Sequence, residues 1–117
     1  ITVSGDEEAL RRGLEILLDN AQKYSSPGGE TQVTLHRRGR NHCALTVANQ
    51  GEPIPPEARR QIFQRFYRAD PARSRNGSFG LGLSIAEGIV AQHHGTIDVT
   101  CAGGFNRFRA ELPCQQE

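Results

Sequence analysis

Two glycines beside an apolar helical pattern are the residues of this chain whose spacing points most directly to chemistry. The run from Gly80 to Ala86 reads Gly-Leu-Gly-Leu-Ser-Ile-Ala. Glycine has no Cβ and lets the main chain approach a ligand, and the first turn of the following helix adds unpaired N–H groups and a partial positive charge. The run predicts a phosphate cradle, and an ordinary pair of turn glycines is the alternative.

A polar pair nearer the N-terminus could complete such a site. Asn20 and Lys23 are three residues apart in a helical pattern, so their side chains lie on one side of the helix. An amide oxygen can complete a magnesium shell shared with phosphates and waters, and a lysine offers a charge to phosphate. The alternative is a solvated polar face near a helix end. Tyr24 beside them is either a rim aromatic or an anchor for the helix end.

Length, charge and cysteine content bound what the chain can be. Its 117 residues fit one domain, and a net charge of +1 gives no electrostatic case for a nucleic-acid partner. No apolar run reaches the roughly 18 residues of a membrane span. The chain opens on a strand-like piece, Ile1 to Val3, without an initiator Met, and so reads as an excised domain. The widely spaced cysteines are expected to be reduced structural thiols: Cys43, Cys101 and Cys114.

The order of the elements predicts the fold. Helical periodicity begins after Asp6, a candidate cap, and ends before Ser25. The patterns then predict strands at 31–38 and 43–48, a loop at 49–56, a short helix from about Pro56 that carries Ile62, Phe63, Phe66 and Tyr67, a polar loop at 70–79, a helix at 82–93, and strands at 96–101 and 107–112. This order predicts an α/β two-layer sandwich.

Four segments, in this order along the chain, resemble the N, G1, F and G2 boxes of the ATP-binding catalytic domains of sensor histidine kinases. They are Ile16–Ser25, Asn49–Pro55, Phe63–Arg68 and Gly80–Leu83. The resemblance implies the Bergerat-type ATP-binding fold, an α/β two-layer sandwich whose mixed, mostly antiparallel sheet is covered by helices on one face. It also implies one catalytic domain over residues 1–117, with an ATP lid at about 70–80 and the dimerisation and phosphoacceptor domain outside this chain.

The resemblance assigns one group of residues to the phosphate end of bound ATP or ADP. It implies that Asn20 holds Mg²⁺ between the phosphates and that Lys23 reaches phosphate or ribose, and it makes these two the catalytic residues. Gly80 and Gly82 would donate main-chain N–H groups to phosphate. The full set implied at this end is Asn20, Lys23, Gly80, Leu81, Gly82 and Leu83.

A second group is implied at the base. Tyr24 would lie against the base, and Asn49 would contact the adenine amino group. Gly51 would let the loop pass beneath the ring, and Ile54 would pack on it. The arginines implied at the root of the lid, as phosphate or packing residues or else as surface charges, are Arg65 and Arg68.

Three positions depart from the family pattern. Asn49 stands where the family usually has Asp, so the adenine amine meets a neutral amide oxygen and affinity is expected to fall. Pro53 replaces a glycine, which fixes φ and removes an N–H. Ile16 stands one turn before Asn20, where the kinases commonly carry a second Asn, so one polar contact to the Mg²⁺ waters is expected to be missing. ATPases of the wider family carry there a Glu that activates water, and an isoleucine cannot remove a proton. Glu15 lies about 100° around the helix and is expected to point elsewhere.

The interpretation that follows is a catalytic domain that binds Mg-ATP and presents the γ-phosphate to a histidine on a separate domain. One alternative is a degenerate nucleotide-binding or protein-docking module without kinase activity. The other is an ATPase of the wider family, which Ile16 disfavours.

The chain's own histidines do not match the family's phosphoacceptor context. His36 and His42 are expected to be solvated beside a hairpin turn, and His93-His94-Gly95 to end a helix with the glycine as its cap. The expected partners are therefore the dimerisation and histidine phosphotransfer domain of the same protein and a cognate response regulator, with no nucleic acid.

Further expectations concern the oligomeric state and location of the isolated domain and of the whole protein. The isolated domain is expected to be a monomer, and the whole protein to be a homodimeric inner-membrane sensor whose cytoplasmic part includes this chain. The wording from Asn49 to Glu57 resembles heavy-metal-responsive kinases.

Overall fold

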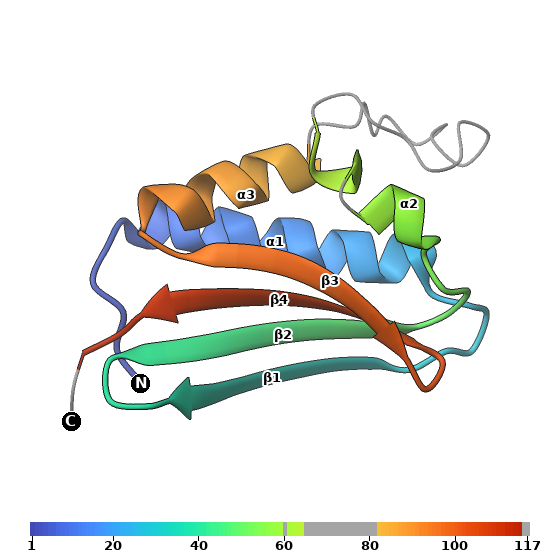
Figure 1. Cartoon of the computed structure of the whole chain (residues 1–117), viewed down its shortest axis with the longest axis horizontal. Helices are drawn as coiled ribbons and strands as arrows, with labels where there is room; N and C mark the ends of the chain where they lie inside the picture. Colours follow the sequence, from blue (N-terminus) through green and yellow to red (C-terminus); the bar gives the residue numbers. More distant parts are fainter. Residues whose placement is uncertain (60, 65–81, 116–117) are drawn as a thin grey trace.

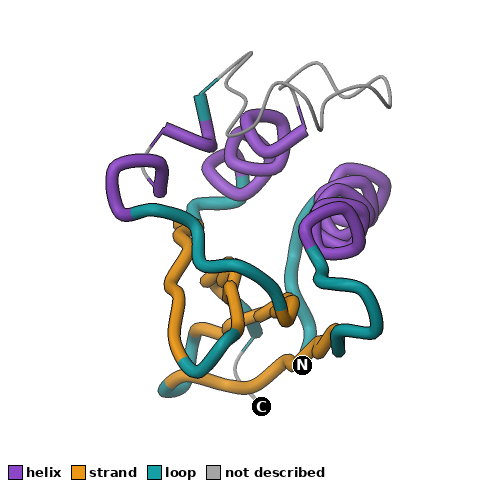
Figure 2. Tube along the Cα trace, turned by 90° about the vertical axis from the view of Figure 1, so that its right-hand side faces the viewer, coloured by secondary structure: helices purple, strands orange, loops and turns teal. Residues whose placement is uncertain are grey.

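The protein is a two-layer arrangement in which helices cover one face of a sheet (Figures 1 and 2). This computed structural model describes residues 1–59, 61–64 and 82–115. The elements are α1 (Glu7–Tyr24), β1 (Thr31–Arg38), β2 (His42–Gln50), α2 (Pro56–Arg59), the 3₁₀ turn η1 (Gln61–Phe63), α3 (Gly82–Gln92), β3 (Thr96–Ala102) and β4 (Phe105–Pro113).

The sheet has the strand order β1-β2-β4-β3, and each neighbouring pair is antiparallel. One row across the sheet runs through Val33, Val47, Phe108 and Val99. The last three of these are buried against the helices, whereas Val33 on the edge strand is 50% exposed. The predicted α/β two-layer sandwich is confirmed. All pairings between the described strands are antiparallel. The sheet was expected to be mixed and mostly antiparallel.

Helix α1 begins where its sequence signals place it. Asp6 has an extended backbone, and its Oδ1 accepts the N–H of Ala9 at 3.2 Å, as an N-cap should. Leu17 and Ala21, one turn apart, are buried and pack in the same core cluster as Phe108. The predicted helix and its cap are confirmed. No helix in the described ranges has the length and apolar content to cross a membrane.

Strand β2 is longer than the sequence pattern predicts. Asn49 was expected in a loop, but it pairs with Thr31 of β1 and with Asn106 of β4. Pairing on both sides keeps the chain extended through Gln50, although the local sequence is polar and turn-like. The loop that follows therefore begins at Gly51, directly beside a strand end.

The segment after this loop is broken rather than one short helix. It consists of α2 and η1, in which Ile62 and Phe63 are buried. The Phe63 ring meets that of Phe108 edge to face, with centroids 6.4 Å apart. Phe66 and Tyr67, expected on the same helix, lie outside the described residues.

The chain ends differ from expectation in one respect. Ile1 to Val3 does not form the strand that its sequence suggested. Instead the carbonyl of Thr2 accepts the N–H of Gln115 at 2.7 Å, so the first residues lie beside the end of the chain.

Helix α3 ends in a Schellman motif whose left-handed residue is a histidine. His94 has φ 64°, its N–H donates to Ala91 O at 3.0 Å, and the N–H of Gly95 donates to Val90 O at 2.9 Å. The expectation that Gly95 is the cap is wrong. A Cβ on Gly95 would lie 2.3 Å from the Glu111 carbonyl oxygen, so the glycine is needed where the chain passes close to β4.

His93 joins the end of α3 to the start of α1. Its Nε2 accepts the N–H of Asp6 at 3.0 Å, and its Nδ1 lies 2.8 Å from Ile89 O. These contacts require the tautomer that carries the proton on Nδ1, which then donates to the carbonyl. The imidazole is a structural link between two helices.

The cysteines are free thiols, as expected. Cys43 is buried in a second small core cluster, against which Cys114 packs. Burial raises the pKa of the Cys43 thiol, and the neighbouring Cys114 thiol raises it further through charge repulsion and a hydrogen bond. The guanidinium of Arg37 donates to Cys114 Sγ at 3.4 Å and lowers the pKa of Cys43 in part.

Candidate functional site

The C-terminal half of α1 carries an amide whose nitrogen has no hydrogen-bond partner among the described residues. Asn20 is half-buried, and its Nδ2 is shielded from solvent without a hydrogen-bond partner among the described residues. A buried amide without a partner costs about 1–3 kcal/mol in a folded protein. Such a group marks a place where a ligand can supply the missing contact.

The start of α3 lies against the same face of α1. A Cβ placed on Gly82 would lie 3.5 Å from Ile16 Cγ2, an ordinary van der Waals contact. Ile16 is one helical turn before Asn20, so the first N–H groups of α3 lie close to the part of α1 that carries Asn20. Leu83 packs against the main core cluster, which leaves its main-chain N–H as its polar group at the helix start.

At the end of β2, a buried amide contacts the end of α1. The side chain of Asn49 is 0% exposed, and its Nδ2 donates to the carbonyl oxygen of Tyr24 at 3.1 Å. That carbonyl belongs to the last residue of α1, where no intrahelical partner exists. Asn49 Oδ1 is buried and has no partner in the described part of the chain. The amide is thus fixed by its donor end and offers one acceptor.

Gly51 is required by this contact. A Cβ at this position would lie 2.5 Å from the Tyr24 carbonyl oxygen and 3.2 Å from Asn49 Nδ2. The N–H of Gly51 donates to Gly104 O at 3.1 Å, which ties the loop to the turn between β3 and β4. Only glycine lets the loop pass this close to the amide.

Asn106 is the residue at this site that the sequence analysis missed. It is 1% exposed, its Nδ2 donates to Glu52 O at 2.9 Å, and its Oδ1 accepts the N–H of Ile54 at 3.2 Å. Asn106 occupies the same inward-facing alternation as Phe108 and Ala110 in β4. An amide at an apolar position of an alternating strand was the signal that could have found it.

The structure brings three groups of predicted residues to one end of the molecule. Asn20, Lys23 and Tyr24 lie in the last two turns of α1, with Lys23 and Tyr24 half-buried. The strand end and loop after it provide Asn49, Gly51 and Ile54, and the start of α3 provides Gly82 and Leu83. The predicted residues that lie outside the described part of the chain are Arg65, Arg68, Gly80 and Leu81.

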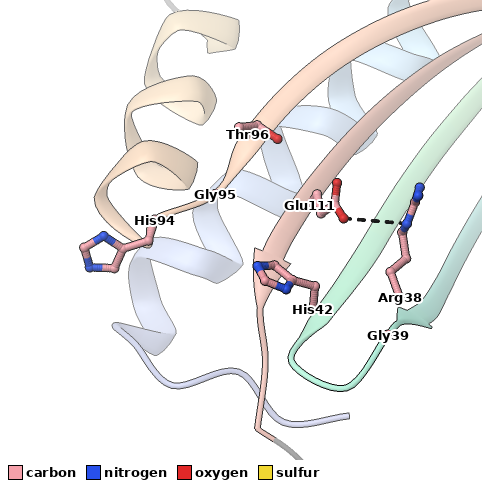
Figure 3. Close-up of a pocket in the computed structure, with 7 residues that line it drawn as sticks. All are labelled: Arg38, Gly39, His42, His94, Gly95, Thr96 and Glu111. Carbon is pink, nitrogen blue, oxygen red and sulfur yellow. Dashed lines mark ion pairs between the residues drawn. The ribbon is translucent and has the colours of Figure 1, made fainter.

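A shallow groove lies at the other end of the sheet, and none of the described residues assigned to the nucleotide lines it (Figure 3). Its volume is about 530 Å³, and Arg38 and Glu111 form an ion pair of 3.6 Å beside it. His42 and His94 at its edges are exposed, and Figure 3 shows His94 pointing away from the ion pair. Within the described residues, no group of three or more His, Cys, Asp and Glu side chains could hold a metal ion.

Sequence comparison finds relatives among sensor kinases. The chain is 49% identical over 104 residues to the signal transduction histidine-protein kinase/phosphatase MprB of Mycolicibacterium smegmatis, covering 87% of this chain and 21% of that protein. It is 44% identical over 112 residues to the sensor histidine kinase CusS of Escherichia coli K12, covering 95% of this chain and 23% of that protein. The chain therefore spans about a fifth of the length of these curated relatives.

Solved structures share the fold. The mycobacterial sensor histidine kinase MprB superposes with a TM-score of 0.86 at 33% identity, over 98% of this chain and 76% of that one. Full-length ShkA in complex with AMPPNP gives 0.84 at 28% identity, over 98% and 23%. ThkA in complex with the response regulator TrrA gives 0.78 at 26% identity, over 97% and 30%.

A family model describes nearly the whole chain. Residues 5–116 match the histidine kinase-, DNA gyrase B- and HSP90-like ATPase model. Together with the sandwich fold and the three groups of residues at one end of it, this match settles the family. The chain belongs to the histidine kinase-, DNA gyrase B- and HSP90-like ATPases, and its relatives within that family are sensor histidine kinases.

Proposed function

We propose that this chain binds Mg-ATP and presents the γ-phosphate to a histidine on a separate domain. One observation carries the proposal. Among the described residues, the side chains with a buried polar atom that lacks a hydrogen-bond partner are Asn20 and Asn49. The resemblance assigns the first to the metal and phosphates and the second to the adenine. A bound nucleotide would supply partners to both amides at once.

At the base end, the orientation of Asn49 favours adenine. Because its Nδ2 donates to Tyr24 O, the free group is the acceptor Oδ1. The exocyclic amine of adenine is a donor and can satisfy this oxygen. Guanine has a carbonyl oxygen at the equivalent ring position, so two acceptors would face one another and one would stay unpaired.

At the phosphate end, the residues fit Mg²⁺ as part of a shared shell. Asn20 Nδ2 has no hydrogen-bond partner among the described residues, and the oxygen of the same amide could be one ligand of the ion, which ordinarily takes its other ligands from phosphates and waters. When bound, the ion neutralises charge on the phosphates. Lys23 lies one turn further along α1 and would add a positive charge there. The N–H groups at the start of α3 would donate hydrogen bonds to phosphate oxygens.

The residue one turn before Asn20 favours transfer over hydrolysis. Ile16 lies against the start of α3, where an activating carboxylate would be needed, and its side chain cannot take a proton from water. The acceptor is then a nucleophile from outside the chain. Relatives named histidine-protein kinases support a histidine as this nucleophile. The resemblance to that family places the histidine on the dimerisation domain of the same protein, in a homodimeric membrane sensor whose cytoplasmic part holds this domain.

The response regulator is proposed on similar grounds. ThkA, which shares the fold, has been solved with the response regulator TrrA, and this supports a regulator of that kind as the downstream partner.

The deciding experiment is a calorimetric titration of the chain with ADP and Mg²⁺. Saturable binding is expected, with GDP bound about tenfold more weakly. Asn41→Ala, at an exposed asparagine of the β1–β2 turn, is the matched control and should bind as the wild type does. No heat with ADP or ATP at millimolar concentration would overturn the proposal and leave the docking-module alternative.

A further inference from the structure

Asn106 holds both sides of a proline in the loop after β2. Its Nδ2 donates to the carbonyl of Glu52 at 2.9 Å, and its Oδ1 accepts the N–H of Ile54 at 3.2 Å. The residue between these two partners is Pro53. One side-chain amide therefore fixes the main chain immediately before and after the proline.

The loop needs such a partner because it cannot make its own ladder. Residues 51–55 have no regular structure, and Pro53 and Pro55 have no N–H to donate. A neighbouring strand would normally offer one donor and one acceptor to an extended segment. The amide of Asn106 offers the same two groups from a single side chain.

The side-chain amide of Asn106 is itself fixed in one orientation. Asn106 is 1% exposed, and the thiol of Cys101 on β3 donates to its Oδ1 at 2.9 Å. Since one end of the amide contacts a carbonyl and the other contacts an N–H and a thiol, only one orientation satisfies all three partners. The Ile54 carbonyl in turn accepts the Nε–H of Arg59 at 3.1 Å, which fixes the other side of the same residue.

The contacts of Asn106 with residues 52 and 54 lie next to the unpaired acceptor of the site, Asn49 Oδ1. Asn106 is the strand partner of Asn49, and Gly51 and Ile54 frame the loop that leaves from the end of that strand. A shift of the loop would move Ile54 relative to Asn49 Oδ1. The geometry of any base bound between them depends on the contact that Asn106 makes.

We propose that Asn106 is a positioning residue for the nucleotide base: it fixes residues 52–54 so that Ile54 packs on a base whose amine meets Asn49. This inference rests on the proposed function. It also accounts for Pro53, since the side-chain amide supplies from β4 the restraint that the loop main chain cannot supply.

The test measures the restraint on the loop and the binding of the nucleotide separately. In Asn106→Ala, the amide proton of Ile54 should exchange with solvent at least about tenfold faster, because it loses its acceptor. The affinity for ADP should fall about tenfold, whereas Mg²⁺-tripolyphosphate, which has no base, should bind as to the wild type. Asn106→Thr, whose hydroxyl can replace part of the contact, should have an exchange rate and an ADP affinity between those of the wild type and Asn106→Ala.

The control is Leu112→Ala, a buried change on the same strand at the far end of the sheet. It should lower Tm but leave the ADP affinity within about twofold when both are measured well below Tm. If Asn106→Ala is unfolded, Asn106→Thr and Cys101→Ala provide the same comparison in milder form.

The outcomes are distinguishable from failure of the proposed function. If the wild type binds no ADP, the proposed function fails, and exchange at Ile54 still decides whether Asn106 holds the loop. If exchange is unchanged in the variants, the hold itself is overturned. If exchange accelerates but ADP binds as tightly as before, or tripolyphosphate is lost equally, the positioning role is overturned.

Discussion

Asn49 and Asn106 lie opposite each other on β2 and β4, and they differ in how their amides are satisfied. Both are buried, at 0% and 1% exposure. The amide of Asn106 has partners at both ends, whereas Asn49 donates to Tyr24 and keeps an unpaired oxygen. Of these two adjacent buried amides, the first therefore presents a single unpaired acceptor and the second has all its hydrogen bonds made within the fold.

Asn49→Asp tests this arrangement through stability. An ionised carboxylate has no N–H for Tyr24 O, so two acceptors would face one another in a buried place. We expect the free energy of unfolding to fall by about 1–3 kcal/mol at pH 7. Burial and the carbonyl should raise the pKa of the introduced carboxyl, so the loss is largest above that pKa and shrinks as pH falls towards about 4, because the protonated acid can donate.

Thermal unfolding between pH 7.5 and pH 5 measures this effect. Asn41→Asp, on the exposed turn, is the matched control and should follow the wild type at each pH. Equal Tm values for Asn49→Asp and the wild type at pH 7 would show that the contact with Tyr24 contributes no stability.

Gly82→Ala tests the phosphate cradle. The new Cβ has ordinary contact with Ile16, and alanine favours a helix more than glycine does, so Tm should stay unchanged or rise. Affinity for Mg-ATP should nevertheless fall severalfold, because the Cβ keeps phosphate from the first N–H groups of α3, while adenosine should bind as before. Calorimetry with both ligands measures the difference.

The control for this change lies on the same helix. Gly88 faces open space, so Gly88→Ala should stabilise α3 by up to about 1 kcal/mol and leave both affinities unchanged. If Gly82→Ala also left Mg-ATP affinity unchanged, the start of α3 would not contact the phosphates.

Asn20→Ala tests the metal assignment. It should weaken binding of Mg-ADP more than tenfold and binding of metal-free ADP much less, because the amide oxygen acts on the nucleotide through the ion. The exposed neighbour Asp19→Ala is the control and should change neither affinity. An equal loss with and without Mg²⁺ would remove Asn20 from the metal. Turnover of ATP by the isolated wild type should be negligible because of Ile16.

Cys43 predicts a fall in stability at alkaline pH. Burial, and then the Cys114 thiol, raise the pKa of Cys43 above the unfolded value, so its contribution is fully present below the unfolded pKa and is lost as pH rises through the folded pKa. The Tm of the wild type should therefore fall on going from about pH 8 to about pH 10. Cys43→Ala should lower Tm at all pH values but flatten this slope, and an unchanged slope would assign it to other groups.

Local rules predicted the parts of the fold that depend on neighbours in sequence. Asp6 caps α1 through a residue three positions away, and the spacing of Leu17 and Ala21 gives the buried face. Asn106 could not be found in that way, because its partners lie 52 and 54 residues earlier and come together only when β4 pairs with β2. Asn49 was misplaced in a loop for the same reason, since its strand conformation comes from pairing on both sides.

The end of α3 shows where a local rule chose the wrong residue. A histidine followed by glycine suggests a glycine cap, but His94 takes the left-handed conformation, and Gly95 is needed for its closeness to Glu111. A non-glycine residue at φ 64° is strained, and glycine is not. His94→Gly should therefore raise the free energy of unfolding by about 0.5–1 kcal/mol, and Gly95→Ala should lower it by more than that, because its Cβ would collide with a main-chain oxygen. Chemical denaturation of the two variants measures both changes, and the opposite signs are the expected result. If the glycine at 95 were the cap, His94→Gly would be neutral or destabilising, since a second glycine would only add freedom to the unfolded chain.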